Sequence, residues 1–122
     1  DVNKQYVPGG TQEIFDHIEV MPNDETMRYS NVIIHSGTND VGIKNINRIC
    51  ENIATTTAVA QQKWPSAKIT VSGITYDRVD GNKNNIISEV NSQSKQTCAQ
   101  FPHARILHGQ QPYYTQPQRN RY

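Results

Sequence analysis

The stretch Asn31-Val32-Ile33-Ile34-His35-Ser36-Gly37-Thr38-Asn39-Asp40-Val41-Gly42 decides the fold of this chain. Its β-branched apolar run from Val32 to Ile34 predicts a buried strand. The strand runs into a polar loop, and a segment with helical periodicity follows that loop. Ligands in open α/β sheets bind beyond the carboxyl ends of the strands. Asn39 and Asp40 therefore lie where a functional site is expected.

Strand and helix patterns alternate on both sides of this stretch. Thr11 is a plausible N-cap for the first helix, and Pro65 ends the longest one. Besides the central strand, the patterns predict strands at 1–7 (a short edge strand), 68–72 and 105–108, and helices at 12–20, 46–64 and 85–101. Alternation of this kind predicts a mainly parallel sheet covered by helices on both faces, a three-layer α/β/α sandwich.

The composition limits the classes of protein to which the chain can belong. Its 122 residues, 34% of them hydrophobic, fit one domain, which we expect over residues 1–108. A polar segment rich in Tyr, Gln and Pro follows at 109–122, and we expect it to be packed and extended. The formal charge of +1 gives no strong field for nucleic acid, so we do not expect a nucleic-acid partner.

No apolar run reaches the roughly 18 residues of a membrane span, and no secretory leader opens the sequence. We therefore expect a soluble protein without a membrane partner, in a compartment that the sequence does not specify. Cys50 and Cys98 lack metal-type spacing, and we expect both to be reduced, partly buried helix residues. No cofactor and no metal site are expected, because no His and carboxylate cluster has ligand spacing.

Gly37-Thr38-Asn39-Asp40 resembles the third sequence block of the SGNH (GDSL-type) hydrolases, a family of esterases and lipases. Pro8-Gly9-Gly10-Thr11 resembles the second block. The resemblance implies a flavodoxin-like SGNH hydrolase fold, of which this sequence supplies the central part. It also implies that the Asn39 side chain and the Gly9 backbone amide are oxyanion-hole donors. Asp40 would fix the loop by accepting hydrogen bonds from backbone amides.

Two blocks of that family are missing from this sequence, the Gly-Asp-Ser nucleophile and the Asp-x-x-His base. None of the four histidines has an aspartate three residues before it: His17, His35, His103 and His108. Ser36 does not replace the nucleophile with His35 as base, because adjacent strand residues point to opposite faces. Both missing blocks would lie before Asp1 and after Tyr122, which suggests a truncated sequence at least as strongly as a decayed one.

Three hypotheses follow from these residues. The chain is part of an SGNH-type hydrolase of acyl or acetyl esters, with the missing blocks supplied by another segment or chain. Alternatively, it is an inactive pseudo-hydrolase that keeps the fold as a binding module for a carbohydrate, a protein or RNA. In the third hypothesis it is a structural domain of a larger assembly. Ester turnover that depends on Asn39 favours the first, and ligand binding without turnover favours the second.

Overall fold

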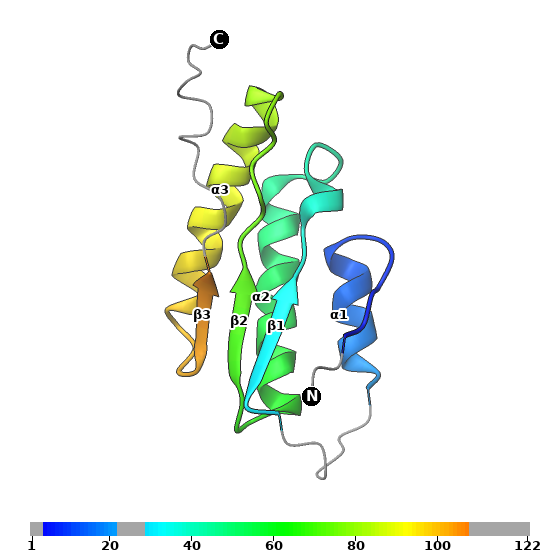
Figure 1. The fold of residues 1–122 in the computed structure, drawn as a ribbon, viewed down its shortest axis with the longest axis vertical. Helices are drawn as coiled ribbons and strands as arrows, with labels where there is room; N and C mark the ends of the chain where they lie inside the picture. The colour runs from blue at the N-terminus through cyan, green and yellow to red at the C-terminus, as the bar shows by residue number, and fades with distance from the viewer. Residues whose placement is uncertain (1–3, 22–28, 108–122) are drawn as a thin grey trace.

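The computed structural model describes residues 4–21 and 29–107. Its elements follow the alternating order that the sequence predicts (Figure 1): α1 (Thr11–Glu19), β1 (Asn31–His35), the 3₁₀ helix η1 (Thr38–Asp40), α2 (Ile46–Lys63), β2 (Lys68–Ser72), α3 (Gly81–Cys98) and β3 (Ala104–Leu107). No helix in these two ranges is long and apolar enough to cross a membrane.

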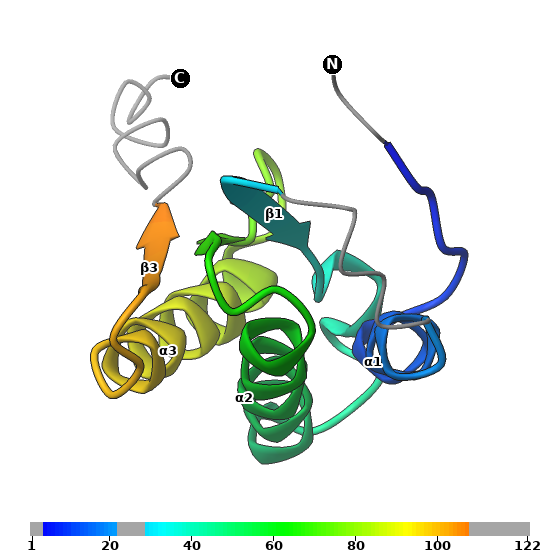
Figure 2. The ribbon, with the colours of Figure 1, turned by 90° about the horizontal axis from the view of Figure 1, so that it is seen from below.

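The three strands form one parallel sheet in the order β1-β2-β3. The predicted α/β class with a parallel sheet is therefore confirmed. In the described part of the chain, α1, α2 and α3 lie on one side of the sheet (Figure 2). The opposite face carries the exposed side chains of Ile33 and Leu107, which are 70% and 55% exposed. The described residues thus place helices on one face of the sheet, and the second helical layer that the sequence predicts is not among them.

The core lies between the sheet and the helices. Ile49, Ile53 and Ala60 of α2 follow helical spacing and are almost fully buried. They contribute to two apolar clusters, one shared with α3 and the other with α1 and β1. The predicted stripe of this helix is therefore the centre of the fold. Cys50 and Cys98 are free and lie on helices, as predicted, but both are buried instead of partly buried.

The helix boundaries differ from the prediction where polar residues act as caps. Gly10, rather than Thr11, is the N-cap of α1, so Thr11 is the first helical residue. The third helix begins at Gly81 instead of residue 85, because the Asp80 carboxylate caps it by accepting from the Lys83 amide. It ends at Cys98, three residues before the predicted end.

The two outer strands also differ from the prediction. Residues 4–7 pair with no strand, so an edge strand there is wrong for these residues; residues 1–3 lie outside the described ranges. β3 covers Ala104–Leu107 instead of 105–108. His108 and the predicted segment at 109–122 lie outside the described residues.

A buried side chain of α3 holds the loop that follows β2. The Asn91 Oδ1 atom accepts from the Ile74 amide at 2.9 Å, and Asn91 Nδ2 donates to the Ile74 carbonyl at 3.0 Å. Both polar groups of Ile74 are thus satisfied by one amide side chain, although Ile74 is buried outside any strand. α3 therefore satisfies both backbone groups of this buried loop residue.

We expect Asn91→Ala to lower the free energy of unfolding by about 2–4 kcal/mol, because it leaves two buried backbone groups unpaired. Chemical denaturation with circular dichroism measures the change. Asn85→Ala, at an exposed position of the same helix, is the matched control and should cost less than about 1 kcal/mol. Equal destabilisation by the two variants would contradict this role of Asn91.

Candidate functional site

The candidate site lies at the carboxyl end of β1, where the chain turns sharply. Gly37 has a φ of +110°, a left-handed conformation that side-chain-bearing residues rarely adopt. A Cβ atom there would also approach Ile74 Cδ1 to 2.7 Å. The turn starts η1, which carries Asn39 on the surface and Asp40 in the interior. A glycine at this position thus permits both the turn and its close packing.

The structure brings Asn39 and Gly9 together, although 30 residues separate them in the chain. Asn39 Nδ2 donates to the Gly9 carbonyl at 2.7 Å. A primary amide has two N–H donors, so one remains available, and neither it nor the Gly9 amide has a hydrogen-bond partner in the described ranges. The residues that carry these two unpaired donors therefore touch each other at the end of the sheet.

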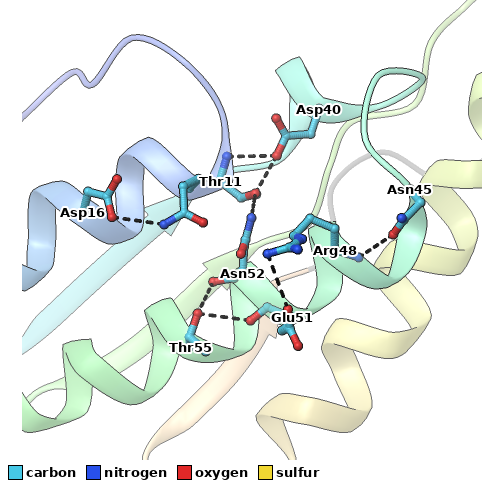
Figure 3. Close-up of polar contacts among 9 residues, drawn as sticks. Thr11, Asp16, Asp40, Asn45, Arg48, Glu51, Asn52 and Thr55 are labelled. Carbon is cyan, nitrogen blue, oxygen red and sulfur yellow. Dashed lines mark hydrogen bonds and ion pairs between the residues drawn. The ribbon is translucent and has the colours of Figure 1, made fainter.

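Asp40 is the buried centre of the site (Figure 3). Its Oδ2 atom accepts from the Thr11 amide at 2.9 Å and from the Thr11 hydroxyl. Asn52 Nδ2 in turn donates to Thr11 Oγ1 at 2.9 Å. These contacts join the first residue of α1, the loop after β1 and the middle of α2, and so they fix the two loops that carry Gly9 and Asn39.

The turn before α1 depends on two glycines and a glutamate. Gly9 has a φ of +113°, and a Cβ atom on Gly10 would collide with the Asp40 carboxylate. The Gly10 amide donates to Glu13 Oε1 at 2.8 Å. This hydrogen bond is the main cause that lowers the pKa of the Glu13 carboxyl below its ordinary value. A hydrogen bond from the Glu13 backbone amide is the second cause. The ionised glutamate therefore holds the turn next to the site.

A groove of about 550 Å³ runs from this site along the outer edge of β1. Residues 31–39 form one wall of the groove, and the extended segment around Tyr6 together with α1 forms the other. Ile14, Ile18 and Trp64 are among its apolar lining residues. Asn39 and Gly9 both line this groove.

The described residues contain no pairing of a serine with a histidine. His35 is exposed and Ser36 buried, in keeping with their opposite directions on the strand, and the Ser36 hydroxyl has no hydrogen-bond partner. His17 Nε2 lies 2.5 Å from Gln5 Oε1.

Burial raises the pKa of both cysteine thiols, which makes them poor nucleophiles. The described part of the chain also lacks a group of three His, Cys, Asp or Glu side chains that could hold a metal.

Thr11 and Asn52 are two members of the site that the sequence patterns did not predict. The position of Asn52 could have predicted that its side chain is buried and hydrogen-bonded, because this polar residue lies between Ile49 and Ile53 on the buried side of α2. A buried amide needs a hydrogen-bond partner. Thr11 had been assigned to a helix cap, whereas its hydroxyl contacts Asp40 and Asn52.

Asp40→Ala is expected to lower the free energy of unfolding by about 2–3 kcal/mol, because the buried Thr11 amide loses its acceptor. Thermal or chemical unfolding measures this. The control is Asp16→Ala, which removes an exposed carboxylate that bonds only Gln12 among the described residues. A loss no larger than that of the control would show that the buried network does not hold the two loops.

The lowered pKa of Glu13 predicts a stability that depends on pH. The wild type should be more stable than Glu13→Gln above the ordinary pKa of 4.5. The difference should disappear as the pH falls through the lower pKa of the folded state, because the protonated carboxyl no longer differs in charge from the amide. Denaturation curves of both proteins between pH 2 and 7 measure it. A difference that does not change with pH would contradict the role of the ionised carboxylate.

Comparison with known proteins gives no family for this chain. No protein-family model matches the sequence, and a search of curated proteins finds no match. A functional assignment therefore depends on the geometry of the site and on the residues themselves.

Proposed function

We propose that this chain carries the oxyanion-hole part of an SGNH-type ester hydrolase, with Asn39 and Gly9 as donors to the developing oxyanion of an acyl or acetyl ester. The observation that supports this proposal most directly is the contact between these residues at the carboxyl end of β1. Each contributes a donor without a partner in the described ranges. Backbone N–H groups and Asn side chains are the kinds of donor that form oxyanion holes for tetrahedral intermediates.

The surroundings of the donors also suit this chemistry. Asp40, Thr11 and Asn52 fix both loops through buried hydrogen bonds, so the donors are held in place before a substrate arrives. Preorganised donors stabilise a transition state more than mobile ones, because no reorganisation is needed during the reaction. The groove beside them has room for the acyl or alcohol part of an ester. The nucleophile and the base would come from residues outside the described ranges or from another chain.

The proposal predicts that the natural polypeptide carrying this sequence hydrolyses p-nitrophenyl acetate. Asn39→Ala should lower kcat about 100-fold with a smaller change in KM, because the donor acts mainly in the transition state. Asn82→Ala, an exposed asparagine on α3, is the matched control and should keep full activity. Thermal unfolding of both variants separates loss of catalysis from loss of the fold.

Two results would contradict the proposal. In the first, the natural polypeptide does not hydrolyse acetyl esters, whether aryl acetates or acetylated sugars are used. In the second, it hydrolyses them and the rate is unaffected by Asn39→Ala. A protein that binds a carbohydrate ligand without turnover would match the other candidate function.

That second candidate is an inactive, SGNH-like module that binds a ligand or supports a larger assembly. It is favoured by the lack of any serine–histidine hydrogen bond in residues 4–21 and 29–107. One Asn39 donor is also already used by the Gly9 carbonyl. In this function the groove binds without chemistry, and the loops around Asp40 have a purely structural role.

A further inference from the structure

The peptide unit between Gly9 and Gly10 is held at both of its polar ends. Its carbonyl accepts from Asn39 Nδ2 at 2.7 Å, and its N–H, which is the Gly10 amide, donates to Glu13 Oε1 at 2.8 Å. The two partners come from different segments, because Asn39 lies on η1 and Glu13 lies in the first turn of α1. These two hydrogen bonds form a clamp on one peptide unit next to the candidate site.

The clamp selects one of two orientations of this peptide unit. A peptide unit between two glycines can turn over at little steric cost, because neither residue has a Cβ atom. In the reversed orientation the Gly9 carbonyl would face the Glu13 carboxylate, and the Gly10 N–H would face the Asn39 amide nitrogen. An ionised carboxylate only accepts hydrogen bonds, and an amide nitrogen only donates them. Both contacts would be lost, so Glu13 and Asn39 together oppose the reversal.

The surroundings of Glu13 keep its carboxyl in the form that the clamp needs. Hydrogen bonds from the Gly10 amide, and then from its own amide, lower the pKa of this carboxyl below its ordinary value. The Lys44 ammonium lowers the pKa further, whereas burial and the Asp40 carboxylate raise it. A Cβ atom on Gly9 would approach Glu13 Cγ to 2.7 Å, so the glutamate side chain packs directly against Gly9. The carboxylate is therefore ionised at neutral pH and adjoins the proposed donor.

Two carboxylates decide which backbone amide of this turn stays unpaired. The amides of residues 9–11 follow one another in the chain. The Gly10 amide donates to Glu13, and the Thr11 amide donates to Asp40. Within the described ranges the Gly9 amide, the first of the three, has no partner. Glu13 and Asp40 thus occupy the two neighbouring amides, and the Gly9 amide is the donor that remains beside the Asn39 loop.

We infer that Glu13 is a positioning residue for the Gly9 backbone amide, because its carboxylate clamps the peptide unit that follows Gly9. The inference rests on the proposed function, in which Gly9 and Asn39 donate to the oxyanion. Glu13 makes no contact with the substrate and acts only through the turn. A donor stabilises an oxyanion best when its direction is fixed beforehand. Loss of the clamp would let the Gly9 amide take several directions.

The first measurement follows the mobility of the Gly9 amide by NMR, in the natural polypeptide that carries this sequence, isotope-labelled at glycine. Its order parameter should be about 0.85 in the wild type, the value of rigid backbone, and below about 0.6 in Glu13→Ala. Glu13→Gln keeps an acceptor for the Gly10 amide, and Asn39 still opposes the reversed peptide, so this variant should restore the wild-type value. Glu19→Ala, which removes an exposed carboxylate from the same helix, is the matched control and should not change it.

The second measurement is the hydrolysis of p-nitrophenyl acetate by the same variants. Glu13→Ala should lower kcat about tenfold and leave KM within about twofold of the wild type, because a misplaced donor affects the transition state more than the bound substrate. Glu13→Gln should restore most of this loss, and Glu19→Ala should have wild-type kinetics. Glu13→Asp keeps the charge but is one methylene shorter, so it should resemble Glu13→Ala. This variant remains decisive if Glu13→Ala does not fold.

Two outcomes would overturn the inference. In the first, the Gly9 amide is as rigid in Glu13→Ala and Glu13→Asp as in the wild type. In the second, Asn39→Ala lowers kcat, whereas both of these Glu13 variants keep the wild-type kcat. Failure of the proposed function gives a different result, because the wild type then hydrolyses no ester. The order parameter would still decide whether Glu13 holds the Gly9 amide.

Discussion

The buried carboxylate of Asp40 is the constraint on which the arrangement of the loops depends. It is 4% exposed, and a buried carboxylate is costly unless hydrogen bonds satisfy it. Thr11 supplies those hydrogen bonds from the start of α1, and Asn52 supports Thr11 from α2. Three segments far apart in the sequence must therefore meet at one point, and the turn through Gly10 has to approach the carboxylate closely.

The candidate site and the groove share β1 as their common element. The loop after β1 carries Asn39, and the outer edge of β1 forms one wall of the groove. β1 is an edge strand in the described part of the chain, and Asn39 and Gly9 line the groove beside it.

The elements that the sequence predicts well are those whose signal is local. The β-branched run of β1 and the apolar stripe of α2 depend only on neighbouring residues, and both elements lie where the patterns indicate. The start of α3 was missed because its first turn is polar and its cap, Asp80, lies in a stretch that resembles a loop. The edge strand predicted near the amino terminus failed at residues 4–7, since pairing requires a partner strand that the pattern cannot indicate.

The sequence by itself determined that an α/β sheet forms and that Gly37, Asn39 and Asp40 follow a buried strand. Periodicity and turn chemistry encode which residues are buried and where the chain bends. Only the tertiary structure decided that Asp40 bonds Thr11, that Asn39 meets Gly9, and that the described helices share one face of the sheet. A sequence pattern can require that a buried polar group be paired, but the partner depends on which distant segments the packing of the helices brings within about 3 Å.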